Sequence, residues 1–448
     1  MTQSRQTGED QALKHTGPQA LGLAFLVALA AGSVLCGYEM LRSTANTLFV
    51  QAYGKQALPW ALGLTLLGVA LLTYLYGRLL SWLGPRHTML ATTFLALCTM
   101  VLGYGAVLLG VRPALVALFV FKESYVVLLI EQIWSYIDSQ LDGKTARRLN
   151  GPICGVAGVG AVLGGLLLGW LSKRFGTQNM LLLAAVATLP ALPLFHLLFA
   201  RFGPPRGQHR SKQDHLALHL FRSERVLLFL IALIAMTQII STVLEIAWKS
   251  TLQDHWPDAD QQNAFSGNYY ALINFAAMFF QFLGAPLMLS VFSARTVHIL
   301  IPIVNLFALA YMFFSPSVWG CAVAYGVFKT LDYSIFRASK ELLYLPLSFD
   351  ARYRSKEVID VLGNRVSKGL ASIAVTFFQW AGVVFSTLIY ATTGLVAVIF
   401  WLVLAFPLTA KNPRASRQLP SEELPEKTPR KTNDQSSKDE RNEVHDIR

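Results

Sequence analysis

Apolar residues in this chain fall into long runs that short polar or charged segments separate. Each run is about 20 residues long, the length of a helix that crosses the hydrocarbon core of a bilayer. Backbone amides in hydrocarbon must be hydrogen-bonded within their own segment, so each run predicts a helix, and the alternation typical of a membrane barrel is absent. The twelve runs cover residues 19–43, 57–82, 88–110, 113–137, 151–172, 179–201, 226–248, 268–291, 296–314, 317–337, 357–381 and 384–408.

The composition agrees with this pattern. Hydrophobic residues make up 54% of the 448 residues, and charged residues only 14%, compared with about 25% in an ordinary soluble protein. A soluble fold of this size needs more polar side chains to cover its surface. The chain is therefore predicted to be an all-α polytopic membrane protein whose outer surface contacts lipid, and a soluble enzyme or a nucleic-acid-binding protein is not expected.

The basic residues are distributed unevenly between the two ends of the predicted helices. The net charge of the chain is +12. If the N-terminus is cytoplasmic, nineteen Lys and Arg residues before the C-terminal tail lie on the cytoplasmic side. The opposite side holds five, which are Lys55, Arg112, Lys173, Arg174 and Lys249. This asymmetry predicts that both termini are cytoplasmic.

A polar segment after the sixth run divides the predicted helices into two sets of six. This organisation is typical of secondary transporters, which bind their substrate between two helix bundles. The tail is rich in Lys, Glu, Pro and Ser and is predicted to be disordered. The predicted parts are an N-terminal tail over 1–18, a first bundle over 19–201, a cytoplasmic linker over 202–225, a second bundle over 226–408 and a cytoplasmic tail over 409–448.

Glycines recur in the fifth run, where Gly160 and Gly164, and Gly165 and Gly169, are four residues apart and share helix faces. Small residues allow helix backbones to approach closely in lipid. The pattern indicates close packing, or a surface on which helices slide. No spacing of His or Cys indicates a metal site, and we expect no cofactor.

Ionisable residues lie within several predicted helices, where they are costly and usually face a bundle interior or a water-filled path. Glu39 and Arg42 are three residues apart, and Glu245 and Lys249 are four apart. Structural pairing is one interpretation, for Lys122 and for the pairs Lys329–Asp332 and Asp360–Arg365 among others. Snorkelling to the interface is expected for Lys249 and Lys340. The others are Glu123, Glu131, Arg337, Glu341 and Lys368.

As a set, these charges favour a binding site for a polyanion. Several cations that converge on one cavity would bind phosphate groups, and carboxylates would hold the cations when the site is empty. Aromatic side chains near them are candidates for stacking on a nucleobase, or alternatively for helix packing and interfacial anchoring. They are Trp134, Trp248, Tyr269, Tyr270 and Tyr333.

Two segments carry residue patterns that are typical of a known protein family. The first is VLEIAWKSTLQDHWPDADQQNAFSGNY, residues 243–269, in which Glu245, Trp248 and Lys249 match the family's pattern. The second is DYSIFRASKELLYLPLSFDARYRSKEVIDVLGNRVSKG, residues 332–369. Its matching residues are Tyr333, Ser334, Phe336, Lys340, Glu341, Tyr344, Pro346, Leu347, Lys356, Asp360 and Lys368.

These segments resemble the ATP/ADP translocase family of obligate intracellular bacteria and plastids. The resemblance implies a fold like that of the major facilitator superfamily, nucleotide transport by exchange and a bacterial inner membrane. It assigns functional charges to Glu245 and Lys340, and an acidic position in the fourth helix to Glu123 or Glu131. The chain departs from the family at Ala45 and Asn46, where the family has a lysine and an aspartate. The candidate substrate-binding residues are Arg42, Glu123, Glu131, Glu245, Lys249, Lys340 and Glu341.

The expected partners are a nucleotide or another phosphorylated anion, and membrane lipid, for a protein that acts as a monomer. Two alternatives remain open. One is a carrier of another organic anion, or a proton-coupled carrier, which the uncharged Ala45 and Asn46 favour. The other is a membrane scaffold without transport activity, which has little use for so many charges within its helices.

Overall fold

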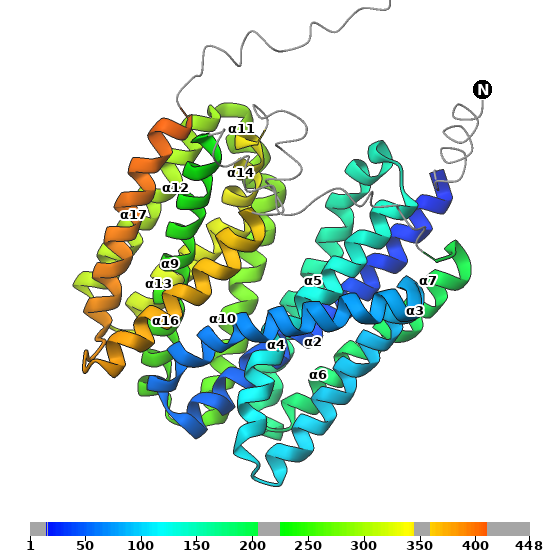
Figure 1. Ribbon diagram of the computed structural model, residues 1–448, viewed down its shortest axis with the longest axis horizontal. Coiled ribbons are helices and arrows are strands. Elements are labelled where there is room, and N and C mark those ends of the chain that lie inside the picture. The colour runs from blue at the N-terminus through cyan, green and yellow to red at the C-terminus, as the bar shows by residue number, and fades with distance from the viewer. Residues whose placement is uncertain (1–14, 16, 205–224, 345–358, 410–448) are drawn as a thin grey trace, which may run out of the picture. The chain divides into compact units, whose positions relative to one another are not determined.

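The helices of the first half follow one another with short connections. The computed structural model describes residues 15, 17–204, 225–344 and 359–409, and residues 1–410 form one unit. The described part contains helices but no strand (Figure 1). The helices of the first half are α2 (Gly17–Tyr53), the short η1 (Lys55–Ala57), α3 (Leu58–Leu108), α4 (Arg112–Gln140), α5 (Gly143–Phe175), α6 (Met180–Thr188) and α7 (Ala191–Phe202).

Among the residues that the structure describes, three π-helical segments interrupt the helices of the second half. They lie within the eighth, tenth and eleventh predicted helices, where each joins or precedes an α-helix. The elements of this half are α9 (Arg225–His255), α10 (Ala259–Phe279), η2 (Phe280–Gly284), α11 (Ala285–Val291), α12 (Ala294–Phe314), α13 (Val318–Leu331), η3 (Asp332–Phe336), α14 (Arg337–Leu343), η4 (Ile359–Val366), α16 (Ser367–Trp380) and α17 (Thr387–Thr409).

The predicted fold class is confirmed, because every apolar run corresponds to helix in the structure. Nine described helical stretches are long and apolar enough to cross a membrane. One of them, α3, contains two of the predicted helices, which meet at a kink where Gly84 has a φ of 73° and Pro85 follows. The predicted helices 317–337 and 357–381 are not among the nine, because their charged residues, such as Lys329, Asp332, Arg365 and Lys368, make them less apolar.

Buried apolar side chains form two cores that largely follow the two halves of the chain. One core includes Leu23 and Met40 of α2 and Phe195 of α7. The other includes Trp248 of α9 and Trp401 of α17, and it extends into the first half of the chain through residues such as Phe49 and Phe119. The exact domain boundaries predicted above stay a prediction, and much of the linker 202–225 and the tail 409–448 lies outside the described residues.

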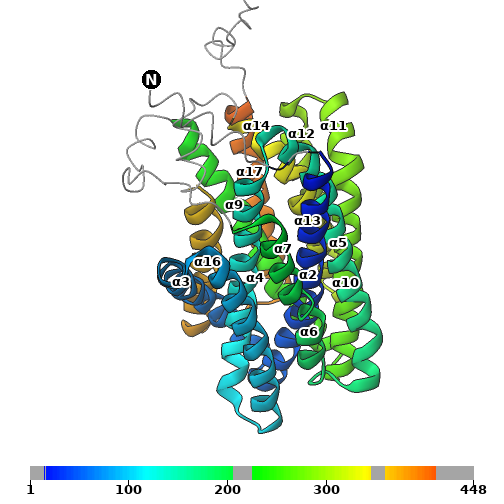
Figure 2. The ribbon, with the colours of Figure 1, turned by 90° about the vertical axis from the view of Figure 1, so that its right-hand side faces the viewer.

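Helix α5 packs closely against a helix from each half, as Figures 1 and 2 show. A Cβ atom at Gly160 would lie 2.2 Å from the carbonyl oxygen of Gly32 in α2. A Cβ atom at Gly165 would lie 2.7 Å from the carbonyl oxygen of Gly267 in α10. The glycines therefore permit the close helix packing expected from their spacing.

Polar contacts join the two halves near the connections that follow α2, α5 and α9. The Lys55 Nζ lies 2.5 Å from a carboxylate oxygen of Asp254 in an exposed ion pair. The Asp260 Oδ1 accepts hydrogen bonds from the backbone N–H of Thr177 at 2.6 Å and from its hydroxyl at 2.7 Å. These contacts hold α10 and the end of α9 against the first half of the chain.

Candidate functional site

Glu245 and Lys249 form a buried ion pair on α9. They are four residues apart, so they lie one above the other on the same helix face, and the Lys249 Nζ lies 2.6 Å from the Glu245 Oε1. The Lys249 ammonium also donates a hydrogen bond to the Asn46 Oδ1 of α2 at 3.2 Å. This contact therefore runs from the second half of the chain to the first.

The expectation that Lys249 snorkels to the interface is wrong. Lys249 is only 4% exposed and Glu245 only 5%. The lysine remains inside because Glu245 and Asn46 together satisfy its ammonium group, which removes the need to reach the headgroups. Lys249 consequently does not count among the basic residues that flank the helices on the outer side.

A second ion pair lies on α4, where the Lys122 Nζ is 2.7 Å from the Glu123 Oε1. Lys122 is fully buried, and its ammonium lies 4.0 Å from the centre of the Phe119 ring. The ring face contributes a favourable cation–π interaction to this buried charge. The same ring lies 5.5 Å from the Lys249 Nζ, so the two lysines approach it from different helices.

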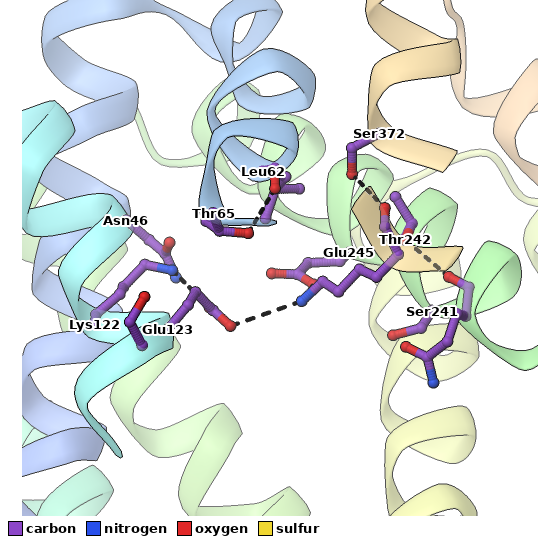
Figure 3. Close-up of polar contacts among 12 residues, drawn as sticks. Asn46, Leu62, Thr65, Lys122, Glu123, Ser241, Thr242, Glu245 and Ser372 are labelled. Atoms are coloured by element: carbon purple, nitrogen blue, oxygen red, sulfur yellow. Dashed lines mark hydrogen bonds and ion pairs between the residues drawn. The ribbon is translucent and has the colours of Figure 1, made fainter. Parts of the chain in front are cut away.

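Lys368 of α16 connects these two pairs. Its Nζ lies 3.1 Å from the Glu245 Oε2 and 3.8 Å from the Glu123 Oε2. Figure 3 shows Glu123 and Glu245 extending toward one another from α4 and α9. The result is a series of alternating charges that we call the central ion network, and it consists of Lys122, Glu123, Lys368, Glu245 and Lys249.

The network links the two halves through side chains that remain partly accessible at its middle. The Lys368 side chain is 23% exposed and that of Glu123 is 21% exposed, whereas the side chains of Lys249 and Glu245 are almost completely buried. The network contains three lysines and two carboxylates. An anion that reaches Lys368 would meet a net positive charge, and it could replace a carboxylate as the partner of the ammonium group.

Arg42 lies beside a different pair of partners. It forms an ion pair with Glu39 one turn earlier on α2, as their spacing indicates, and its guanidinium lies 3.8 Å from the centre of the Tyr270 ring of α10. The centre of the Tyr38 ring of α2 lies 5.4 Å from the same guanidinium group. Arg42 therefore contacts both halves, and Tyr270 packs on a cation in this structure.

Trp248 packs between helices, which is the alternative to stacking on a nucleobase. Its ring is fully buried, and its centre lies 4.3 Å from that of the Tyr269 ring. Phe265 packs against it as well, with ring centres 6.0 Å apart. A side chain enclosed in this way has no free face for a nucleobase.

The remaining candidate residues lie outside the ion network. Glu131 is exposed on α4, two helical turns beyond Glu123, so Glu123 is the acidic residue of α4 that faces the network. Lys340 is half-buried and Glu341 is exposed on α14. Neither is part of the ion pairs that make up the network within the described residues.

Lys329 and Asp332, which are predicted to pair, carry opposite charges that interact, but the described side chains form no close ion pair like those of the central ion network. The Lys329 Nζ instead donates to the Ser241 Oγ of α9 at 2.8 Å. Asp332 lies three residues after Lys329, where the π-helical segment η3 begins. The predicted Asp360–Arg365 pair stays a prediction, because the Asp360 side chain lies outside the described residues.

Sequence reasoning omitted Lys368, Lys122 and Asn46 from the candidate site. Lys368 carried two signals, because it is a charge within an apolar run and matches the second family segment. Asn46 was noted only as a departure from the family, although a neutral amide at an otherwise charged position is a natural partner for an ammonium group. For Lys122 the sequence suggests structural pairing, and its ion pair with Glu123 agrees with that interpretation.

Comparison with known proteins supports the resemblance drawn from the two segments. Residues 206–412 match the family model described as TLC ATP/ADP transporter. ADP,ATP carrier protein 1 of Rickettsia bellii is 28% identical over 185 residues, which are 36% of this chain and 37% of the carrier. ADP,ATP carrier protein 1 of Chlamydia trachomatis is 26% identical over 212 residues, or 43% of this chain and 39% of the carrier. Each match thus spans well under half of the carrier's length.

Solved transporter structures share the fold over most of the chain. A mutant of the nucleoside transporter NupG superimposes with a TM-score of 0.66 at 15% identity, covering 87% of this chain and 99% of that one. A D-xylose–proton symporter gives a TM-score of 0.61 at 14% identity, covering 87% and 99%. These similarities establish the fold but not the substrate. The chain therefore has the fold of these solved transporters, and its residues 206–412 resemble the TLC ATP/ADP transporter family.

Proposed function

We propose that this protein is a secondary transporter that exchanges nucleotides, of the ATP/ADP type, by alternating access between its two halves. Relatives that match 36% and 43% of the chain carry the name ADP,ATP carrier, and the matching family model and the fold are those of transporters rather than enzymes. The proposal includes a bacterial inner membrane location, cytoplasmic termini and action as a monomer.

The central ion network is the observation that carries this proposal. Lys368 pairs with Glu245 of the second half and lies 3.8 Å from Glu123 of the first. When the halves separate on this side, the contact between Lys368 and Glu123 must break. Breaking a largely buried charge contact is costly unless another anion replaces the lost partner. A phosphate group that binds Lys368 would supply that replacement.

In the proposed mechanism, carboxylates hold the lysines in the empty protein and phosphate oxygens take their place in the loaded protein. Arg42, Lys249 and Lys340 are proposed to contact phosphate oxygens together with Lys368. Glu245 and Glu123 would accept these cations again when the substrate leaves. Reorientation would be faster with an anion bound, because the ligand stabilises the conformation in which the inter-half contact is broken. This requirement leads to exchange rather than net transport.

Counterflow in proteoliposomes tests the proposal directly. The purified full chain is reconstituted into vesicles that contain unlabelled ADP, and uptake of radiolabelled ATP is measured. We expect uptake that depends on the internal nucleotide and that is lost in a folded Glu245→Gln variant. Folded wild-type protein that takes up no nucleotide under any internal condition would reject nucleotide exchange.

A carrier of another anion, or a proton-coupled carrier, is the second candidate. The uncharged side chain of Asn46, to which Lys249 donates a hydrogen bond, favours this alternative, because the translocase family has a charged pair at this position. Thermal stabilisation by a panel of organic anions, combined with uptake driven by a pH gradient, separates it from nucleotide exchange. A non-transporting scaffold predicts instead that Glu245→Gln alters assembly and that the wild type has no flux.

A further inference from the structure

An apolar pocket lies between the two limbs of α3 and helix α4. The kink at Gly84 and Pro85 divides α3 into a first limb over residues 58–83 and a second limb over 85–108. The pocket has a volume of about 450 Å³, and a lining of this kind favours an apolar ligand or the apolar part of one. The three helical segments all contribute to the lining, which includes Leu72, Leu75, Leu79, Leu95, Leu128 and Leu129.

The pocket forms because α3 and α4 touch at one point and then diverge. A Cβ atom at Gly68 of α3 would lie 2.1 Å from the Cγ1 of Val120 in α4, so the glycine permits this close contact. Figure 1 shows the first limb of α3 running obliquely across α4. The residues of this limb that line the pocket begin with Leu72, about one helical turn beyond Gly68. The crossing therefore leaves a space between the two helices.

This pocket is separate from the central ion network. Leu75 is nine residues from Leu66, which lies against α16, and nine residues are about two and a half helical turns. Leu75 thus lies on the face of α3 opposite the one that contacts the second half. On α4, Phe121 and Tyr125 line the pocket. Each is two residues from Glu123, so they point away from the side of α4 that carries the network.

The pocket opens toward the lipid. Leu75 and Leu95 of its lining are 48% and 55% exposed, and exposed leucines on membrane helices contact acyl chains. Along the first limb the lining extends from Leu72 to Trp82, which is about 15 Å at 1.5 Å per residue. The hydrocarbon core of a bilayer is about 30 Å thick, so this length matches the hydrocarbon layer of one leaflet. One acyl chain of a phospholipid spans the same layer.

A cation and an exposed indole lie at one end of the pocket. Arg78 and Trp82 both line it, and they are four residues apart on one face of α3. Trp82 is 82% exposed, and tryptophan is enriched where acyl chains meet headgroups. Arg78 is exposed, and among the described side chains it forms no ion pair with a carboxylate. This end, close to the kink at Gly84, therefore offers a positive charge at the level of the headgroups.

We propose that the pocket is a binding site for one anionic phospholipid, which places an acyl chain along the leucines and its headgroup phosphate at Arg78. A guanidinium donates parallel hydrogen bonds to phosphate oxygens. A headgroup with a net negative charge is favoured over a zwitterionic one, because no ammonium group of the lipid offsets the attraction to Arg78. The site is distinct from the proposed nucleotide site and does not depend on transport.

An arginine near the end of a membrane helix can also extend to headgroups without a defined site, and this case makes a different prediction. Filling the pocket would then leave lipid binding unchanged. Leu75→Trp provides this test, since Leu75 lines the pocket and is half exposed. Leu272→Trp is the matched control, because Leu272 is also exposed and lines another apolar pocket, between α10 and α13, whose lining contains no Lys or Arg.

The test counts the phospholipids that stay bound to the purified full-length protein in detergent, by native mass spectrometry. Phosphatidylglycerol and phosphatidylcholine with the same acyl chains are compared. We expect the wild type to retain one phosphatidylglycerol in preference to phosphatidylcholine, and Leu75→Trp to lose it. Arg78→Gln should weaken phosphatidylglycerol binding by about fivefold, and Arg78→Lys should keep the preference.

Arg174→Gln is the matched control for the charge. Arg174 lies on α5 with its guanidinium 4.5 Å from the centre of the Trp170 ring, so it repeats the arginine–tryptophan pair four residues apart at a different place in the molecule. We expect Arg174→Gln and Leu272→Trp to retain the bound phosphatidylglycerol. The melting temperature of each variant shows that it is folded, and the wild-type comparison of the two lipids requires no variant.

Four outcomes would overturn the lipid site. The first is equal retention of the two lipids by the wild type, and the second is retention of phosphatidylglycerol by folded Leu75→Trp. The third is thermal stabilisation of the wild type by inorganic phosphate as strong as that by phosphatidylglycerol, which would assign Arg78 to a free anion. The fourth is a wild-type dimer that Leu75→Trp converts to a monomer, which would assign the pocket to a second copy of the chain. No nucleotide is present, so failure of nucleotide counterflow leaves the result unchanged.

Discussion

The Lys368 ammonium of α16 lies 3.1 Å from the Glu245 carboxylate of α9 and 3.8 Å from the Glu123 carboxylate of α4, in the central ion network. These three residues come from helices that are far apart in the sequence. Their contact therefore joins the two halves of the chain. An anion that replaces a carboxylate as the partner of Lys368 would break this contact and so change how the halves pack.

Lys368→Met should reduce nucleotide exchange by about tenfold or more, because it leaves Glu245 and Glu123 facing one another without their shared cation. The same substitution should lower stability by about 2 kcal/mol. Lys368→Arg should retain much of the stability, since a guanidinium also pairs with two carboxylates. Counterflow and thermal unfolding measure the two effects.

A double variant provides the control for Lys368. Glu123→Gln combined with Lys368→Met removes one of the two facing carboxylates, so part of the lost stability should return. If the double variant is as unstable as the sum of the single variants, the two residues do not interact and the bridging role of Lys368 is wrong.

Asn46→Asp should stabilise the empty protein and weaken binding of anions. The substitution places a carboxylate about where the Asn46 Oδ1 now accepts a hydrogen bond from Lys249 at 3.2 Å. A charged acceptor strengthens that bond by about 1–2 kcal/mol, and the same carboxylate competes with phosphate for the lysine. The melting temperature and the half-saturating nucleotide concentration should both increase.

Asn305→Asp is the matched control for this substitution. Asn305 is buried on α12 and donates a hydrogen bond to the carbonyl oxygen of Ile301, with no described cation in ion-pair distance. A carboxylate at this position loses the donor and buries a charge without a partner, so it should lower stability. If Asn46→Asp raises the stability and Asn305→Asp lowers it, the Lys249 ammonium is the reason for the higher stability of Asn46→Asp.

The helices and the charge pairs within one helix were predictable from the sequence, whereas the charged contacts between distant helices were not. A run of apolar residues about as long as the bilayer is thick has few alternatives to a membrane helix, and each predicted run is helical in the structure. Local pairs were also accessible, because Glu39 with Arg42 and Glu245 with Lys249 depend only on the helical repeat. The helical repeat does not indicate the close partner of Lys329, whose ammonium group donates a hydrogen bond to Ser241 of α9.

The burial and the partners of each charged side chain depend on which helices pack against one another. Lys249 lies near the end of an apolar run, so snorkelling was the natural expectation. Its true position follows from Asn46, about 200 residues earlier in the chain. Likewise, nothing local to Lys368 indicates Glu123 or Glu245. Such contacts between distant segments are set by the packing of α16 against α9 and α3, which the hydrophobic pattern of each helix does not specify.

Gly160→Ala should destabilise the protein by about 1–3 kcal/mol, as overpacked helix contacts do. The added Cβ would lie 2.2 Å from the Gly32 carbonyl oxygen, and both are backbone positions that cannot turn aside. Gly105→Ala in α3 is the control, because a Cβ there meets nothing within 4 Å and alanine favours helix over glycine. Thermal unfolding should show a lower melting temperature only for Gly160→Ala.

Two polar contacts between the halves should differ in strength because they differ in burial. Asp260 accepts two hydrogen bonds from Thr177, which is itself buried. Asp260→Ala leaves the Thr177 N–H and hydroxyl without their acceptor and should cost about 1–2 kcal/mol. Lys55 and Asp254 are 35% and 58% exposed, so Lys55→Met should change stability by less than about 1 kcal/mol.

Thermal unfolding of both variants in the same detergent tests this comparison, and Asp260→Asn serves as the conservative control because its amide oxygen still accepts hydrogen bonds. We expect the order of melting temperatures to be wild type and Lys55→Met highest, Asp260→Asn intermediate and Asp260→Ala lowest. A larger loss in Lys55→Met than in Asp260→Ala would mean that the exposed ion pair, rather than the hydrogen bonds to Thr177, holds this end of the two halves together. Raising the salt concentration then distinguishes the two cases, since salt screens the exposed pair much more than the buried hydrogen bonds.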